Sequence, residues 1–244
     1  MKSLFVAWQD PKSRQWAPVG RLSRDDGQYH FVYTQGAEEL PNFTPFGRMN
    51  NLKAEYVSDE LFPLFANRIL AKSRPEYDRY LGWLGLDRVK YDALDELART
   101  GGLRATDSLE LFPCPHPTTN RLYEVFFFSR GLRHLHAENQ RRANDLKSGE
   151  RLYVMPDLQN EFDNMALLLR TGDPITLVGY APRYFSGEFS RLMQAVGAEK
   201  LVATVEKVNV DAPLQYRVLC KIKAPWPTNF QPCQDRFFEP ISKC

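Results

Sequence analysis

The chain has 244 residues, a mass of 28.2 kDa and 43% apolar residues, enough for one large domain or two ordinary domains with their own cores. Its formal net charge is only +2, which excludes a protein that coats nucleic acid through a global basic excess, so any such binding has to be local. No stretch approaches the roughly 20 apolar residues that span a bilayer, and the start of the chain has no secretory apolar core, so we expect no membrane partner.

Short apolar segments separated by turn residues open the chain. Period-two alternation predicts three strands, at residues 4–8, 19–22 and 29–33. Helix-start signals and apolar stripes then predict three helices, at residues 58–70, 73–85 and 92–99. The last of them ends on the pair Gly101-Gly102. The first half is therefore predicted to be a small β-sheet with helices.

This half resembles a known family in several short motifs. They are Val6-Ala7-Trp8, Val19-Gly20-Arg21-Leu22, Phe31-Val32-Tyr33, the segment 61–67 and the segment 108–113. Together they are similar to the amino-terminal subdomain of HipA-type toxin kinases, over about residues 1–115. The chain has no room for the kinase core and shows neither a phosphate-cradling Gly-rich loop nor a catalytic Asp with a metal-binding partner. The resemblance implies a domain without its catalytic part.

A proline-rich hinge separates the halves. Three prolines between Phe112 and Pro117 disfavour a helix and a central strand, which places the boundary near residue 115. Beyond it we predict strands at residues 122–128, 152–155, 166–169, 175–180, 201–208 and 214–222. One short helix is predicted near 186–197, and residues 136–150 are predicted to form a loop. Such short strands closed with one helix suit a small barrel, followed by a Pro-rich tail at 225–244. The fold class is therefore α+β.

Polar and aromatic side chains gather between two of these strands. Asn160, Phe162 and Asp163 lie in the loop before one strand, and Arg183 follows the next strand. Asn and Asp can bond sugar and base groups, the ring can stack on a base, and Arg can pair with a phosphate. This combination suits the exposed end of a nucleic acid. An Asn and an Asp in a loop also commonly bond their own backbone and cap turns, so the spacing leaves both interpretations open.

The order of motifs in this half resembles a second family. The motifs are Gly131-Leu132-Arg133-His134-Leu135, Leu152-Tyr153-Val154, Asn160-Glu161-Phe162-Asp163, Val178-Gly179-Tyr180 and Arg183. They look like the successive motifs of the HIRAN domain, over roughly residues 116–224. That family is a small β-barrel module related to the OB fold. It is found fused to fork-remodelling helicases in eukaryotes and alone or beside other modules in bacteria, so the resemblance favours a bacterial protein.

The HIRAN resemblance implies a function and a site. In HIRAN domains that capture DNA ends, a pocket takes the terminal nucleotides of a single strand and an acidic residue holds the free 3′ hydroxyl; here that role falls to Asp163. The implied nucleic-acid-binding residues are Arg133, His134, Asn160, Phe162, Asp163, Tyr180 and Arg183. Phe162 stands where a tyrosine is expected and His134 where a second aromatic is expected, so stacking is kept without the hydroxyl bonds. The sequence leaves open whether binding is strictly selective for a 3′ end, and whether the ligand is DNA or RNA. DNA repair or phage defence are the expected settings.

Each of these residues also has a structural interpretation. Phe162 can fill the barrel, His134 can be a satisfied strand histidine, and Arg183 can pair with Asp157 or Glu161. A protein-interaction or adaptor role of residues 1–115 is the alternative function, and an exposed aromatic surface there would favour it. The sequence is silent on oligomeric state.

The chain is not expected to be an enzyme. Pro156-Asp157 hints at a nuclease, but Glu206-Lys207 lacks the required spacing. The four cysteines, Cys114, Cys220, Cys233 and Cys244, match neither a zinc site nor a disulfide framework, and Cys114-Pro115-His116 is at most half of a metal site. We therefore expect no cofactor or metal, and a reducing cytoplasmic location.

Overall fold

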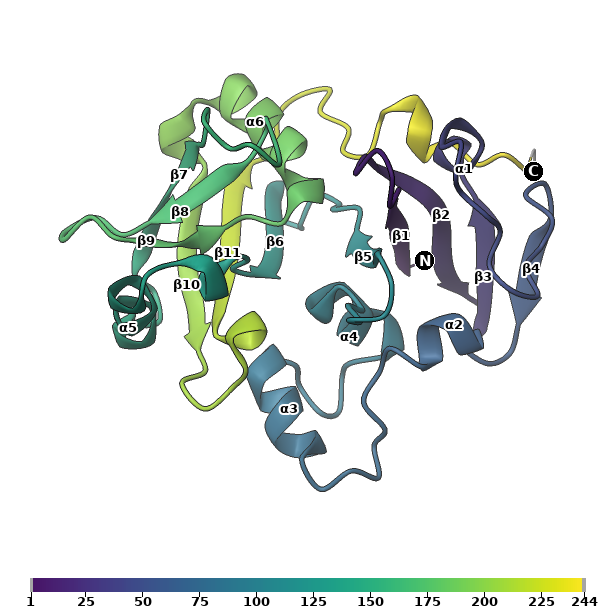
Figure 1. The fold of residues 1–244 in the computed structure, drawn as a ribbon, viewed down its shortest axis with the longest axis horizontal. Coiled ribbons are helices and arrows are strands. Elements are labelled where there is room, and N and C mark those ends of the chain that lie inside the picture. The colour runs from purple at the N-terminus through teal and green to yellow at the C-terminus, as the bar shows by residue number, and fades with distance from the viewer. Residues whose placement is uncertain (1, 243–244) are drawn as a thin grey trace. The chain divides into compact units, whose positions relative to one another are not determined.

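The computed structural model describes residues 2–242, so the expectation for Cys244 lies outside the described residues. The chain divides into two compact units, each with its own antiparallel sheet (Figure 1). Unit 1 is formed by the chain up to Asp78, Leu86–Cys114 and the segment from Cys233 onward, and unit 2 by Arg79–Gly85 and Pro115–Pro232. The protein is therefore a mixed α/β chain with two antiparallel sheets, which agrees in outline with the predicted class.

Unit 1 contains a five-stranded sheet in the order β4-β3-β2-β1-β5. Its strands are β1 (Lys2–Gln9), β2 (Trp16–Asp25), β3 (Gln28–Tyr33), β4 (Glu55–Ser58) and β5 (Leu109–Pro113). Its helices are α1 (Gln35–Glu39), α2 (Pro63–Ala66), α4 (Ala93–Thr100) and the short 3-10 helix η4 (Arg236–Phe238), while α3 (Tyr77–Leu84) begins in unit 1 and continues into unit 2. The three amino-terminal strands predicted from alternation are present.

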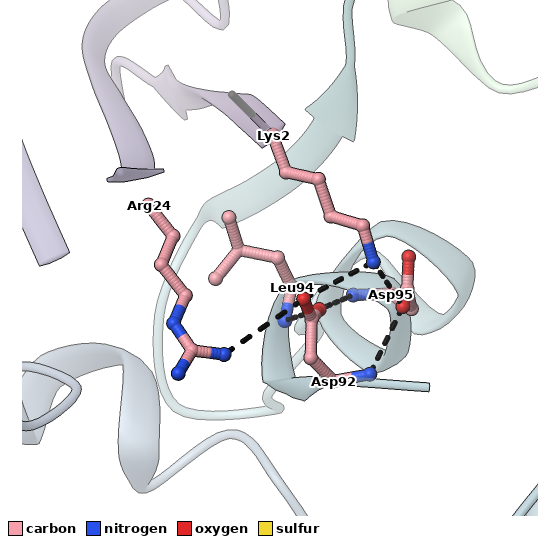
Figure 2. Close-up of polar contacts among 5 residues, drawn as sticks. All are labelled: Lys2, Arg24, Asp92, Leu94 and Asp95. Atoms are coloured by element: carbon pink, nitrogen blue, oxygen red, sulfur yellow. Dashed lines mark hydrogen bonds and ion pairs between the residues drawn. The ribbon is translucent and has the colours of Figure 1, made fainter. Parts of the chain in front are cut away.

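Helix α4 shows how local sequence sets an element's bounds. The Asp92 side chain accepts hydrogen bonds from the backbone N–H groups of Leu94 and Asp95, both at 3.0 Å, and the Asp95 carboxylate accepts one from the Asp92 N–H at 2.9 Å (Figure 2). Lys2 on β1 donates to both carboxylates, at 3.1 and 2.6 Å, which places positive charge beside the acidic first turn. Gly101 ends the helix with φ 73°, a left-handed conformation that favours glycine. The helix predicted at residues 92–99 is confirmed by this geometry.

Unit 2 contains a six-stranded sheet in the order β6-β11-β10-β7-β8-β9, with every pair antiparallel. The strands are β6 (Leu122–Phe128), β7 (Arg151–Pro156), β8 (Leu167–Arg170), β9 (Leu177–Tyr180), β10 (Val202–Val208) and β11 (Val218–Pro225). The helices are α5 (Ala137–Asp145) and α6 (Arg183–Val196), with the 3-10 turns η1 (Leu132–His134), η2 (Ala198–Lys200) and η3 (Leu214–Tyr216). Figure 1 shows this sheet curled into a half-barrel.

The two edges of the curled sheet meet at one point. Arg130, just after β6, exchanges two backbone hydrogen bonds of 2.9 Å with Tyr180 at the end of β9. The Ser129 hydroxyl also donates to the Val178 carbonyl at 2.6 Å. Gly179 lies between these contacts with φ 117°, and a Cβ there would be 2.0 Å from Ser129 Oγ and 2.5 Å from the Arg130 carbonyl oxygen. Only glycine permits this approach of the two edges.

Gly179→Ala should therefore destabilise the protein. The added methyl collides with backbone and the φ value is strained for any L residue, so we expect a loss of about 2 to 3 kcal/mol in unfolding free energy. Gly149→Ala is the matched control, because Gly149 has φ 83° but nothing within 4 Å of an added Cβ. Chemical denaturation of both variants measures the difference. Equal losses would mean that the contact with Ser129 and Arg130 does not constrain the closure.

The inner face of the sheet and α6 form the core of unit 2. Leu152, Leu169 and Val178 point inward and are buried, and Phe185 and Phe189 of α6 pack in the same core. These two rings are stacked, with centroids 5.2 Å apart. This packing holds α6 against the sheet, and the helix begins at Arg183, three residues after the last residue of β9.

Three sequence expectations in this unit were wrong. Residues 136–150 were expected to be a loop, but they contain α5, of which only Ala143 is buried. With so few apolar residues, the sequence of α5 shows no apolar repeat at helical spacing, so it gave no signal for a helix. Arg133 and His134 were expected on a strand but lie in η1, and the start of the strand expected at 214–222 is the turn η3.

Two segments pack away from their sequence neighbours. In α3, Arg79 pairs with Asp211 at 2.7 Å, and the Trp83 indole donates to the same carboxylate at 3.2 Å. At the other end of the chain, the Phe238 ring packs edge-on against Phe5 of β1 at 4.7 Å. Packing thus assigns part of α3 to unit 2 and the segment from Cys233 to unit 1, whereas the sequence-based division was 1–115, 116–224 and 225–244.

Candidate nucleic-acid interface

The loop between β7 and β8 is folded around Asn160. The Asn160 Oδ1 atom accepts hydrogen bonds from the backbone N–H groups of Phe162 at 3.0 Å and Asp163 at 2.9 Å. Asp163 Oδ1 in turn accepts from the Met165 N–H at 3.0 Å. Asn160 and Asp163 therefore do cap their own turn, as one interpretation of the sequence held. The turn also points the Phe162 ring outward, with 84% of the residue exposed, so this ring does not fill the barrel.

Asp157 links the loop to β9. Its carboxylate accepts from Asn160 Nδ2 at 3.1 Å and from the Tyr180 hydroxyl at 2.9 Å. The hydrogen bonds from Asn160 and Tyr180 lower the pKa of Asp157 below its usual value, so the carboxylate is ionised at neutral pH. Burial and the bond to Asp157 raise the pKa of Tyr180, which keeps its hydroxyl a donor. Sequence reasoning did not place Asp157 in the site, although its spacing of three residues before Asn160 is typical of such turns.

Arg183, the first residue of α6, closes the cluster. Its Nε lies 3.2 Å from Asp163 Oδ2, and its Nη2 donates to the Phe162 carbonyl at 2.8 Å. It thus pairs with Asp163, rather than with Asp157 or Glu161. A guanidinium has five N–H donors and a carboxylate has about four acceptor positions, so both groups keep capacity for a ligand. The Asp163 side chain is 15% exposed and that of Arg183 is 38% exposed.

Arg133 and His134 lie beside this cluster on η1. The Arg133 Nε donates to His134 Nε2 at 2.9 Å, and both residues are exposed. Within the described part of the chain, no hydrogen bond or ion pair joins their side chains to the Asn160 loop. The segment that precedes η1 contacts the site at Tyr180. Arg130 exchanges backbone hydrogen bonds with Tyr180, and a Cβ on Gly131 would be 3.3 Å from the Tyr180 ring.

The structure therefore brings part of the predicted site into one network. That network contains Asn160, Phe162, Asp163, Tyr180 and Arg183. It offers an exposed ring for stacking, a guanidinium for a phosphate and carboxylates for hydroxyl or amine groups. These are the groups that hold a single nucleic-acid strand without reading its sequence.

Comparison with known proteins adds a family match for this part of the chain. Residues 122–227 match the HIRAN domain family, which confirms the resemblance predicted for this part of the chain and indicates nucleic-acid binding in general. No curated protein matches the chain. A solved structure of a protein from Lactobacillus plantarum is 16% identical and covers 42% of this chain and 98% of that chain, with a TM-score of 0.32. That likeness is too low to inform the fold.

No comparison supports the resemblance of residues 1–115 to HipA-type kinases. Among residues 2–242, no helix is long and apolar enough to cross a membrane. The same residues contain no group of three or more His, Cys, Asp or Glu side chains arranged to hold a metal ion.

Proposed function

We propose that this protein binds single-stranded DNA and holds the 3′ end of the strand at the Asn160 loop. The observation that carries the proposal is the exposed Phe162 ring, fixed beside the Asp163 and Arg183 pair. It lies in the region that matches the HIRAN family. An exposed flat ring offers a face on which a base can stack, which supports a binding role for this turn.

Each side chain has a role in this proposal. The terminal base stacks on Phe162, Arg183 contacts a phosphate, and Asp163 accepts a hydrogen bond from the terminal hydroxyl. Arg133 and His134 on η1 flank the strand. Base stacking contributes about 1 to 3 kcal/mol per base, and phosphate contacts add a salt-dependent share. The total is on the order of 8 kcal/mol, which corresponds to micromolar, sequence-tolerant binding.

A titration tests the proposal. A fluorescent single strand, the matched duplex and the matched RNA strand are titrated with the full chain at two salt concentrations. We expect preference for the single strand over the duplex. We also expect the association constant to fall by about 0.7 logarithmic units per phosphate contact for each tenfold rise in salt concentration. Binding of the duplex as tight as that of the single strand, or no binding, would contradict the proposal. The RNA arm decides between the two nucleic acids.

In this proposal the curled sheet of unit 2 is an OB-like barrel that binds DNA. The protein acts in DNA repair or phage defence. That the chain has no catalytic activity stays a prediction. The adaptor role of residues 1–115 also stays a prediction. Among residues 2–114 the exposed large apolar side chains are Val57, Val89 and Leu103, and none is aromatic, so no observation favours that role.

A further inference from the structure

A second set of cationic and aromatic side chains lies on the outward face of β7 and β8. Tyr153 of β7 stands directly opposite Arg170 of β8, and Arg151 precedes Tyr153 by two residues on the same face. The two guanidinium carbons lie 5.3 Å (Arg151) and 4.6 Å (Arg170) from the centre of the Tyr153 ring. Tyr153 is 39% exposed. We call Arg151, Tyr153 and Arg170 the Arg–Tyr platform.

Within residues 2–242, no acidic side chain neutralises the two arginines of this platform. Arg170 is oriented by Met155, whose sulfur lies 2.9 Å from its Nε, and by the Thr171 carbonyl, also at 2.9 Å. No carboxylate of the described residues pairs with Arg151 or Arg170. Other arginines of unit 2 do have acidic partners, among them Arg79, Arg142 and Arg183. Two guanidinium groups held on a ring therefore keep donors free for anionic oxygens.

The platform is continuous with the candidate site. Met155 pairs with Leu168, and Leu168 pairs with Tyr180, so these three residues form the next row on the same outward face. Rows on one face of a strand are two residues, or about 7 Å, apart. Tyr180 is also the residue that bonds Asp157 of the loop site. A strand that leaves the loop site can therefore reach the platform directly.

We propose that the Arg–Tyr platform is a second subsite for single-stranded DNA, which receives the nucleotides that follow the terminal ones. Arg151 and Arg170 bind phosphates. A base stacks on the flat surface formed by the two guanidinium groups and the Tyr153 ring. The inference rests on the proposed function and extends it along the strand. Single OB folds cover about 4 to 16 nucleotides, which is compatible with a site that includes both regions.

Strand length separates the two regions in an experiment. The full chain and the variant Arg151→Gln/Arg170→Gln are titrated with a thymidine trinucleotide and a thymidine dodecanucleotide, both with a free 3′ hydroxyl. We expect the variant to bind the trinucleotide as the wild type does, and the dodecanucleotide about tenfold more weakly. The salt slope for the longer strand should fall by about 1.4, the share of two phosphate contacts. Tyr153→Ala should also weaken binding of the longer strand only.

The control removes the same charge elsewhere. Arg191→Gln/Lys200→Gln changes exposed residues of α6 and η2, off the sheet, and should leave both affinities within about twofold. An unchanged dodecanucleotide affinity in the platform variant, or an equal loss for both strands, would overturn the inference while the proposed function stands. If the wild type binds neither strand, the proposed function fails and the inference fails with it.

Discussion

Phe162→Ala should weaken binding of a single strand by roughly 5- to 150-fold, the equivalent of one base stack of about 1 to 3 kcal/mol. The ring makes few contacts within the folded protein, because 84% of the residue is exposed. Stability should therefore change by less than about 0.5 kcal/mol. Fluorescence anisotropy and thermal unfolding of the same preparation measure the two quantities.

Leu158→Ala is the matched control for this variant. Leu158 lies in the same loop and is 88% exposed, so its removal takes away a similar apolar surface without a ring. We expect it to bind the strand as the wild type does. If both variants lost affinity equally, general apolar contact and not base stacking would be the role of the loop. Phe162→Trp should retain binding, since stacking needs only a flat ring.

Asp163→Asn should abolish the preference for a free 3′ end. In the wild type, the Asp163 carboxylate accepts a bond from a 3′ hydroxyl and repels a 3′ phosphate. A charge-assisted hydrogen bond contributes about 1.5 to 3 kcal/mol, so the affinity ratio between the two ends should be roughly tenfold or more. In the variant, the ratio should approach one. The same substitution releases Arg183 from its ion pair, so the affinity for the phosphorylated strand should rise.

Glu161→Gln controls for charge alone. Glu161 is exposed in the same loop and its replacement removes the same negative charge, so both affinities should rise slightly and their ratio should persist. If the wild type bound strands with a free and a phosphorylated 3′ end equally well, capture of the 3′ end would be ruled out, while binding of the strand itself would stand. The departures from the family pattern at Phe162 and His134 make this ratio the informative quantity, because neither side chain supplies the hydroxyl that a tyrosine would.

The sequence was sufficient to predict those helices and strands whose bounds are set by residues close to them in the chain. The cap residue Asp92 and the glycine Gly101 set the limits of α4, and the apolar run Leu122–Phe128 coincides with β6. The Asn160 turn is also local, since its hydrogen bonds join residues two or three positions apart. These features follow from short-range chemistry. The sequence predicted α4 and β6, and it gave the Asn160 turn as one of two open interpretations.

Features that depend on strand pairing were not predictable. The glycine in Val178-Gly179-Tyr180 was visible, but its need for small size arises from Ser129 and Arg130, which the closure of the sheet brings close. The Arg–Tyr platform likewise depends on the register that sets Tyr153 opposite Arg170. A shift of the β7–β8 register by one residue would place Tyr153 and Arg170 on opposite faces of the sheet. Helix α5 was missed for another reason, since it buries almost no apolar surface.

A photocrosslink from the 3′ end of the strand tests most directly whether that end lies at the Asn160 loop. A single strand with iodouracil as its 3′-terminal base is bound to the full chain, irradiated and digested, and the crosslinked peptide is identified by mass spectrometry. We predict a crosslink at Phe162, which is lost in Phe162→Ala and retained in Leu158→Ala. A crosslink in residues 2–114, or one that Phe162→Ala leaves unchanged, would contradict this prediction.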